Sequence, residues 1–441
     1  MGLISDSVLK DVRVRVSVES LAQAFADYPR RDFHVRLWDG TTWGAGGNPR
    51  FTLVIKHPNA LRQLFDAPSE LTLGECYIHD ELDVEGDIEA AVEMGDFLLA
   101  QERRSLPASL RLAGILGILP GQHSNPEAED IFPGTLHSRE RDRRAISHHY
   151  DLPPEFFALW LDRRRIYSCA YFESEDCDLD TAQRRKLDYI CRKLRLRPAE
   201  RLLDIGCGWG GMLIHAASHY GVQALGITLS VQQAEVARNR IRELGLNDRC
   251  RVEVCDYRDL ELDEQFEKIT SIGMFEHVGE AQLPEYFSRL WRLLRSGGIL
   301  MNAGISASAT YRRHGPSFID RYVFPDGELV PISTSLKAAE LCNFEVRDVE
   351  SLREHYALTL RHWVRRLEAN AEKATRLTNQ TTYRIWRLYM AASAHAFSAG
   401  RVNLYHALLV KPVGGATDMP LTRADWYRNW DDQQTQGNDR V

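Results

Sequence analysis

Short apolar runs alternate with amphipathic stretches through the C-terminal part of the chain. Runs with the length and composition of buried strands occupy residues 201–205, 223–227, 251–255, 268–272 and 298–303. Stretches with apolar residues at helical spacing occupy residues 211–218, 232–244, 284–294, 358–370 and 382–399. Strands that alternate with helices in this way build a parallel sheet covered by helices. The pattern therefore predicts a domain of the α/β class.

Residues 7–100 show a different pattern, with shorter elements. Phe33–Trp38 alternates apolar and polar residues as a half-buried strand does, and further strands are predicted at 51–55 and 82–87. Short helices are predicted at 58–65 and 88–100, and Asp87 has the position of an N-cap for the second of them. This part of the chain is expected to form a smaller α+β domain.

The chain between these two parts is apolar and then polar. Residues 106–119 are rich in leucine and isoleucine, include Arg111 and follow Arg103 and Arg104. This composition fits an amphipathic segment lying in a membrane interface, and it equally fits an interdomain helix. We expect an N-terminal accessory domain at residues 1–105, a connector at 106–140, the larger domain at 141–415 and a C-terminal tail at 416–441.

Charge, cysteine spacing and the length of apolar runs exclude several classes of partner and site. The formal net charge of the 441 residues is -7, which argues against nucleic acid as the main partner. The arginines at 139, 141, 143 and 144 fit either a basic patch facing a membrane or a solvated helix face. The eight cysteines lack C-x-x-C spacing, so neither a metal site nor a disulfide framework is expected. No apolar run approaches the roughly 20 residues that a membrane span needs, and no signal peptide is seen. A cytoplasmic protein is predicted.

The strand predicted at 201–205 ends in a glycine-rich loop, Gly206-Cys207-Gly208-Trp209-Gly210-Gly211. Glycines allow the backbone to approach a ligand closely, because no Cβ intervenes. No Lys-Ser/Thr pair follows, which excludes a P-loop, and the spacing is not the G-x-G-x-x-G of a dinucleotide site. An acidic residue, Asp204, stands at the end of the strand.

The run Asp204–Gly210 resembles the first motif of S-adenosylmethionine-dependent methyltransferases. Four further stretches occur in the order Tyr167–Phe172, Gly226–Gln233, Asp256–Asp259 and Met274–Gly279. Together they resemble the cyclopropane-fatty-acyl-phospholipid synthases and the related mycolic-acid cyclopropane synthases and methyltransferases. Leu73–Asp87 resembles the accessory domain of the long bacterial synthases.

The resemblance covers about residues 30–410. It implies a Rossmann-like S-adenosylmethionine methyltransferase domain preceded by the smaller α+β domain. In the family the small domain helps the enzyme to dimerise and to engage the bilayer, so a homodimer bound peripherally to the inner face of the membrane is expected. Unsaturated phospholipid acyl chains are the expected substrate.

The cofactor is expected at the carboxyl ends of the first strands of the sheet. Gly206, Gly208 and Gly210 would allow the protein backbone to approach the methionine part of the cofactor closely. The second strand ends in Thr228-Leu229-Ser230, without the carboxylate that many Rossmann-like folds place there. The resemblance assigns cofactor binding to this stretch and to further residues, so the full expected set is Tyr167, Ser168, Asp204, Gly206, Gly208, Gly210, Thr228, Leu229, Gln233, Asp256 and Tyr257. Tyr257 could stack on the adenine or be a core aromatic residue.

The reaction that the resemblance implies starts at a carbon–carbon double bond, which no side chain can activate by deprotonation. The enzyme must bury the sulfonium beside the alkene and exclude water. In the family a bound bicarbonate then removes a proton so that a cyclopropane ring closes. The positions that match its ligands are Cys169, Glu276, Ile305 through its backbone, and Tyr356. Cys169 taken alone also fits a small buried apolar residue.

One position departs from the family. Ala303 stands where the family has a histidine that binds the bicarbonate, so the anion would lose a partner. The bicarbonate site would be weakened by about 1.5 to 3 kcal/mol. The expected activity is still addition of a methylene bridge across the acyl double bond, as in a cyclopropane synthase. Two alternatives stay open: methyl transfer that gives a methylene- or methyl-branched chain, and a non-catalytic lipid-binding homologue.

Overall fold

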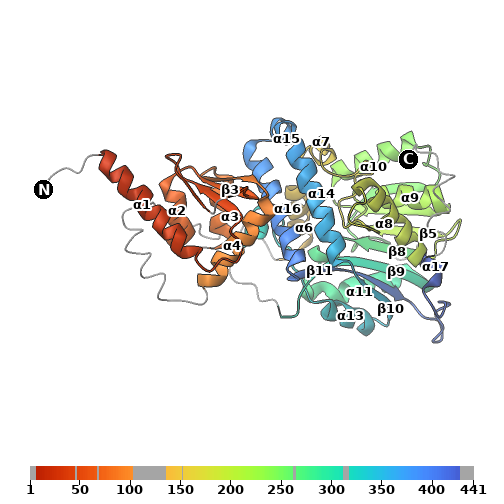
Figure 1. Cartoon of the computed structure of the whole chain (residues 1–441). Helices are drawn as coiled ribbons and strands as arrows, with labels where there is room; N and C mark the ends of the chain where they lie inside the picture. The colour runs from red at the N-terminus through yellow and green to blue at the C-terminus, as the bar shows by residue number, and fades with distance from the viewer. Residues whose placement is uncertain are drawn as a thin grey trace. The chain divides into compact units, whose positions relative to one another are not determined.

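The computed structural model describes residues 6–44, 47–66, 69–102, 136–150, 152–261, 265–310 and 317–427 (Figure 1). Contacts divide the chain into two compact units. The N-terminal unit comprises Met1–Ile131, His314–Val323 and Asn379–His395, and the C-terminal unit comprises Phe132–Arg313, Phe324–Thr378 and Ala396–Val441. The apolar segment 106–119 lies outside the described residues, as does most of the expected connector. The expected boundaries after residues 105, 140 and 415 stay a prediction.

The C-terminal unit is built on a seven-stranded sheet with the order β10-β11-β9-β8-β5-β6-β7. The strands are β5 (Arg201–Ile205), β6 (Gln223–Thr228), β7 (Cys250–Val254), β8 (Phe266–Ile272), β9 (Leu294–Ala307), β10 (Glu345–Ser351) and β11 (Val402–Val410). Strands β5 to β9 run parallel to one another, and β11 runs antiparallel to both β9 and β10. All five predicted strands are confirmed. The sequence did not predict β10 and β11, so the sheet is mixed and not purely parallel.

Helices cover both faces of this sheet (Figure 1). The helices of the C-terminal unit are α6 (Arg139–Tyr150), α7 (Pro154–Ala158), α8 (Leu179–Leu194), α9 (Gly211–Tyr220), α10 (Val231–Glu243), α11 (Leu283–Leu293), α13 (Ile332–Leu341), α14 (Arg353–Ala369), α15 (Ala371–Leu377) and α17 (Ala424–Tyr427), with 3₁₀ turns at Phe275–His277 and Glu280–Gln282. One core joins α8, α9 and α10 to Met301 of β9, and a second joins α11 and α13 to Leu300. Adjacent residues of one strand thus serve opposite faces, as the period of a strand requires. The Rossmann-like α/β fold is confirmed.

The N-terminal unit contains a four-stranded sheet with the order β2-β1-β3-β4. Its elements are α1 (Asp6–Ala24), β1 (Phe33–Arg36), β2 (Thr42–Gly44), β3 (Phe51–Ile55), α2 (Pro58–Asp66), α3 (Glu70–Ile78), β4 (Leu82–Gly86), α4 (Ile88–Glu102), α12 (Phe318–Tyr322) and residues 380–395 of α16 (Gln380–Ser398). The Ala90 amide donates to Asp87 Oδ1 at 3.1 Å, which confirms Asp87 as the cap of α4. The expected small α+β domain is confirmed.

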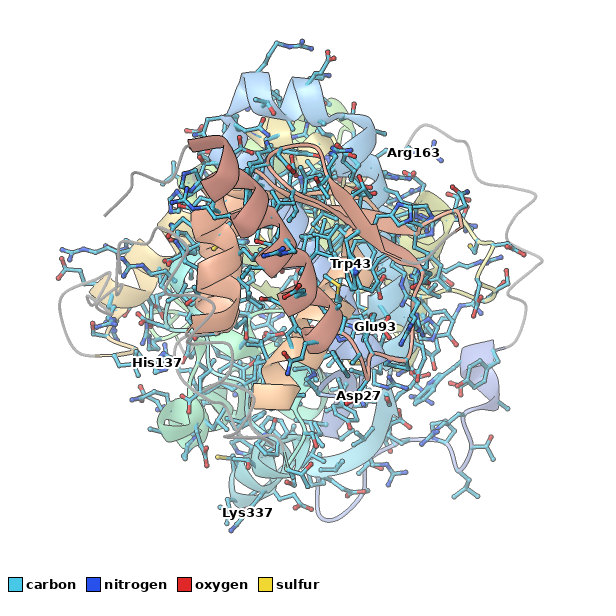
Figure 2. The ribbon with its side chains drawn as sticks, turned by 60° about the vertical axis from the view of Figure 1, so that its left-hand side comes forward. Asp27, Trp43, Glu93, His137, Arg163 and Lys337 are labelled. Carbon is cyan, nitrogen blue, oxygen red and sulfur yellow. The ribbon has the colours of Figure 1, made fainter. Side chains whose placement is uncertain are left out.

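Aromatic side chains hold the core of the N-terminal unit together. The ring of Phe33 stacks on that of Phe51 at a centroid distance of 5.7 Å, and Phe25 meets Phe33 edge-on at 5.2 Å. Trp43, labelled in Figure 2, lies 5.9 Å from Phe33. At the surface of the unit Glu93, also labelled there, forms an ion pair with Arg30 at 3.0 Å.

Two buried arginines attach α16 to this unit, although the helix lies far from it in the sequence. Arg384 donates to the carbonyl of Tyr77 at 2.7 Å and to Asp83 Oδ2 at 2.8 Å. Arg387 donates to the hydroxyl of Tyr77 at 2.9 Å and to the carbonyl of Val84 at 3.1 Å. The arginines satisfy backbone carbonyls of the small unit, which is why this part of the helix belongs to it.

Among the described helices, none combines the length and the apolar character needed to cross a bilayer.

Candidate active site

A pocket opens at the carboxyl ends of β5, β6 and β8, beside the 3₁₀ turn at Phe275–His277. In a sheet of this topology β5 is the point at which the strand order reverses, and ligands bind there. The pocket is lined by most of the residues that the sequence assigned to a cofactor, namely Tyr167, Ser168, Asp204, Gly206, Gly208, Thr228, Leu229, Gln233, Asp256 and Tyr257. Their role in binding stays a prediction, but they share one cavity.

The glycine loop turns sharply at the end of β5. Gly206 has φ +77° and Gly208 has φ +53°, a region that residues with a Cβ rarely adopt. A Cβ on Gly206 would also lie 3.1 Å from the Cβ of Met274 on the next loop. The backbone here therefore requires glycine for its conformation and leaves the pocket open.

Gly210 is different from the other two glycines. It does not line the pocket among the described residues, and it caps the N-terminus of α9 with φ +80°. A Cβ there would lie 3.1 Å from the Cβ of Ala237 on α10. Gly210 allows these two helices to pack closely, which is a structural reason for a glycine that was expected to contact the cofactor.

Asp204 is buried at the end of β5. Its Oδ1 accepts a hydrogen bond from Thr270 Oγ1 at 2.8 Å. Burial raises the pKa of Asp204 to about 6, although Thr270 and the nearby Lys186 both lower it. This carboxyl group therefore titrates closer to neutral pH than an exposed aspartate does.

The end of β6 carries hydroxyl and amide groups where other folds carry a carboxylate. Thr228 Oγ1 donates to Gln233 Oε1 at 2.8 Å, and the Gln233 amide nitrogen donates to Ser230 Oγ at 3.2 Å. Ser230 thus caps α10 and fixes Gln233, while Leu229 supplies an apolar surface to the pocket.

A chain of ion pairs borders the pocket at the end of β7. Arg258 Nη2 lies 2.6 Å from Asp256 Oδ2 and 2.9 Å from Asp142 Oδ2 of α6. Burial opposes ionisation of Asp256, but the hydrogen bonds from Arg258 outweigh it and hold its pKa below the ordinary value. His137, labelled in Figure 2, lies just before α6 and 3.8 Å from Asp142. Sequence reasoning missed Asp142 and Arg258, because pairing across more than a hundred residues leaves no local signal.

The predicted catalytic residues lie outside the lining of this pocket, in two linked pairs. Glu276 Oε1 accepts a hydrogen bond of 2.7 Å from the Ile305 amide nitrogen. Glu276 Oε2 is buried without a hydrogen-bond partner, and burial raises the pKa of this carboxyl to about 7. The neighbouring residues Met274 and His277 line the pocket, so the turn that carries Glu276 forms part of the pocket wall.

Cys169 and Tyr356 form the second pair. The Cys169 thiol lies 3.9 Å from the carbonyl oxygen of Leu352, which also accepts a hydrogen bond from the Tyr356 amide at 3.1 Å. Burial raises the pKa of the Cys169 thiol well above its ordinary range, so the thiol is uncharged. The amide of Leu352 donates to Leu404 of β11, and Leu404 pairs with Ile305 of β9. Backbone contacts therefore connect the two pairs.

Ala303 is 1 % exposed and lies opposite His406 in the pairing of β9 with β11. His406 is 2 % exposed, and its Nδ1 has no hydrogen-bond partner. An imidazole is thus present next to the position where the sequence lacks one.

A buried lysine, Lys186 of α8, also lines the pocket and was not predicted. The available signal was its place on the apolar face of a helix, one turn after Ala182 and one turn before Ile190. That signal is weak because lysine stems commonly lie along apolar surfaces while the amine reaches water.

Comparison with known proteins identifies the family. The family model described as mycolic acid cyclopropane synthetase matches residues 137–407, and a domain of unknown function (DUF7884) matches residues 20–96. A probable fatty acid methyltransferase of Pseudomonas putida is 42% identical over 89% of this chain and 96% of its own length. The cyclopropane-fatty-acyl-phospholipid synthase of Escherichia coli (strain K12) is 35% identical over 63% of this chain and 70% of its own length.

A solved structure supports the same family assignment. The mycolic acid cyclopropane synthase CmaA1 complexed with SAH and CTAB superposes with a TM-score of 0.58 at 33% identity, over 61% of this chain and 98% of that one. Together with the glycine loop and the sheet order, these matches show that the chain belongs to the cyclopropane synthetase family of S-adenosylmethionine-dependent fatty acid methyltransferases.

Proposed function

We propose that this protein transfers the methyl group of S-adenosylmethionine to the double bond of unsaturated phospholipid acyl chains. When bound, the cofactor supplies an electrophilic methyl group on a positively charged sulfur. The pocket at the ends of β5 and β6 fits this cofactor, with glycines for close approach and Leu229 and Tyr257 as apolar surface. The ligands of CmaA1 support the proposal, since SAH is the form of such a cofactor after methyl transfer.

The single observation that carries the proposal is the unpaired Oε2 of Glu276. In the reaction the two π electrons of the alkene form the new carbon–carbon bond, and the electrons of the sulfur–carbon bond stay on sulfur. The neighbouring alkene carbon becomes a cation, which must lose a proton to yield a stable product. A buried carboxylate can stabilise the cation and accept that proton.

The electrostatics of Glu276 suit this role. Its pKa of about 7 means that a substantial fraction is ionised at neutral pH and that it can hold the proton it receives. The bond from the Ile305 amide fixes Oε1, which leaves Oε2 as the basic atom. Cys169 and Tyr356 would complete an apolar wall that keeps water away from the cation.

The residues present do not fit the bicarbonate ion of the family. The Ile305 amide, one of its expected donors, is already bonded to Glu276, and Ala303 has no donor group. The Cys169 thiol is aimed at the carbonyl oxygens of Ala170 and Leu352. In the proposed reaction the proton therefore passes to Glu276 and not to this ion.

The favoured product is a methylene-branched chain. Shift of a hydride from the methylated carbon to the cation, followed by loss of a proton from the new methyl, gives an exocyclic double bond. Reduction to a methyl branch would need a separate hydride donor. Ala303 supports this product, because it replaces the histidine that in the family binds the bicarbonate used for ring closure. The similarity to the probable fatty acid methyltransferase of Pseudomonas putida supports methyl transfer to an acyl chain.

A cyclopropane ring is the second candidate. It forms when the proton leaves the new methyl before any hydride shift, and the two electrons of that bond close the ring on the cation. The 35% identity to the Escherichia coli synthase favours it.

The enzyme would act as a peripheral protein at the cytoplasmic face of the membrane, since its substrate chains belong to the bilayer. The N-terminal unit would engage the membrane or mediate a homodimer. Light scattering of the purified full chain tests the dimer, and vesicle flotation tests the membrane contact.

The reaction is tested with trideuteromethyl S-adenosylmethionine and vesicles of a phospholipid with one cis double bond per acyl chain. Both products retain two of the three deuteriums, but only the methylene product keeps a carbon–carbon double bond, which hydrogenation followed by mass spectrometry reveals. Labelled lipid should appear with the wild type and not with Glu276→Gln. If the wild type binds vesicles and releases no S-adenosylhomocysteine above this control, the protein is a lipid-binding homologue and the proposal is wrong.

A further inference from the structure

We propose that Lys186 is a positioning residue that, through the hydroxyl of Ser168, holds the carboxylate of the methionine part of the cofactor. The inference rests on the proposed function, because it assumes that S-adenosylmethionine occupies the pocket.

Lys186 combines deep burial with a place on the pocket wall. The residue is 1 % exposed, and its Nζ donates to Ser168 Oγ at 2.8 Å. Both residues line the pocket. Within the described part of the chain, no carboxylate lies within ion-pair distance of the amine. A buried cation without an anionic partner is costly, so a ligand that supplies negative charge would be bound favourably.

The charged and titratable groups that face Lys186 are Cys169, Asp162, Asp204 and His406. The two carboxyl groups among them have other partners. Asp162 accepts hydrogen bonds from the amides of Arg164 and Ile166, and Asp204 accepts one from Thr270. The thiol and the imidazole are uncharged, because burial raises the pKa of Cys169 and lowers that of His406. Asp162 and Asp204 stabilise the charged amine only from a distance, and within the described residues its hydrogen-bond partner is the neutral Ser168 hydroxyl.

The direction of the hydrogen bond between Lys186 and Ser168 determines which group Ser168 can offer to the ligand. An ammonium group only donates, so Ser168 Oγ accepts from Lys186 and its own proton is free to be donated onward. Ser168 thus presents a donor strengthened by the cation behind it, which suits a carboxylate.

Other pocket cations are less suitable. Arg258 is already bonded to Asp256 and Asp142. Arg165 lines the pocket, but it is only half buried, and water screens its charge. The methionine ammonium, in turn, would find the acidic side of the pocket at Asp204.

The experiment compares two ligands by isothermal titration calorimetry. S-adenosylhomocysteine has the carboxylate, whereas 5′-methylthioadenosine lacks the whole amino-acid end. Lys186→Met should weaken binding of S-adenosylhomocysteine by about ten- to hundredfold, the effect of losing a charge-assisted hydrogen bond. Binding of 5′-methylthioadenosine should change by less than about threefold, within the effect of a remote substitution.

Lys193→Met is the matched control. Lys193 lies on the same face of α8, is fully buried and pairs with Glu350, but it does not line the pocket. Its substitution should lower the melting temperature and leave the affinity for both ligands unchanged.

The wild type provides a measurement that needs no variant to fold. Burial lowers the pKa of Lys186 to about 8, so the amine loses its charge as the pH rises through 8 in the free protein. Affinity for S-adenosylhomocysteine should fall between pH 7 and pH 9. The amine of the ligand also titrates in this pH range. Ser168→Ala keeps that contribution but removes the hydroxyl that links Lys186 to the ligand carboxylate. The affinity of the wild type should therefore fall more steeply with pH than that of Ser168→Ala.

If Lys186→Met weakens binding of both ligands equally, or weakens binding of neither, the role of Lys186 is wrong and the proposed function stands. Failure of the wild type to bind S-adenosylhomocysteine at any pH would overturn the proposed function as well.

Discussion

Ala303 of β9 lies directly opposite His406 of β11. Residues opposed in an antiparallel pair point to the same face of the sheet, so the methyl group and the imidazole are neighbours. Introducing the family's histidine by Ala303→His would place two imidazoles in space that now holds one. We expect overpacking that lowers the free energy of unfolding by about 1–3 kcal/mol, measured by urea denaturation.

A second substitution relieves this crowding. Ala303→His combined with His406→Ala moves the imidazole from one strand to the other at nearly constant volume. The double variant should recover more than half of the lost stability and make at least as much cyclopropane product as the wild type. A double variant that is no more stable than Ala303→His alone would show that the His406 side chain does not occupy the space into which a histidine at position 303 extends.

Substitution of Glu276 should lower activity and raise stability. Its pKa is raised in the folded protein, so between the unfolded pKa and about 7 the folded state holds a proton that the unfolded state has lost. Stability therefore falls as the pH rises through this window, by about 3 kcal/mol in total. Glu276→Gln removes this penalty and keeps an acceptor for the Ile305 amide.

We accordingly expect Glu276→Gln to unfold at a higher temperature than the wild type at pH 8 and at nearly the same temperature at pH 4. Methyl transfer should be abolished while S-adenosylhomocysteine still binds. Wild-type turnover should rise with pH around 7, because only the ionised carboxylate accepts a proton. A variant less stable at pH 8 would show that the buried charge has a partner.

The sequence could predict the parts of the site that are local in the chain. The glycine loop, the strand 201–205 and the end of β6 follow one another within about 30 residues, and their pattern is strong. The bond between Glu276 and Ile305 could not be foreseen, because it depends on how β8 and β9 are placed in the sheet. Strand β11 was missed because only Ala399, Gly400 and Arg401 separate it from the long helical pattern of α16.

Gly206→Ala should weaken cofactor binding without unfolding the protein. The substitution forces a Cβ into a left-handed conformation and to 3.1 Å from the Cβ of Met274, so the pocket wall formed by Gly206 and Met274 must shift. We expect binding of S-adenosylhomocysteine to weaken more than tenfold, measured by calorimetry. Gly245→Ala is the control, since it has φ +67° but open space around a Cβ. It should cost about 1 kcal/mol of stability and leave binding unchanged.

Arg384→Met should destabilise the N-terminal unit more than the loss of an exposed ion pair does. Arg384 is 4 % exposed and neutralises Asp83 while it satisfies the carbonyl of Tyr77. Removing it takes one donor each from the Asp83 carboxylate and the Tyr77 carbonyl, while Lys56 and the Asp80 amide remain close to them, so we expect a cost of about 1–3 kcal/mol. Arg36→Met breaks the exposed pair with Glu85 and should cost less than about 1 kcal/mol. Hydrogen exchange of the β3 and β4 amides should speed up in Arg384→Met alone, and equal exchange in the two variants would mean that α16 contributes nothing to the stability of this sheet.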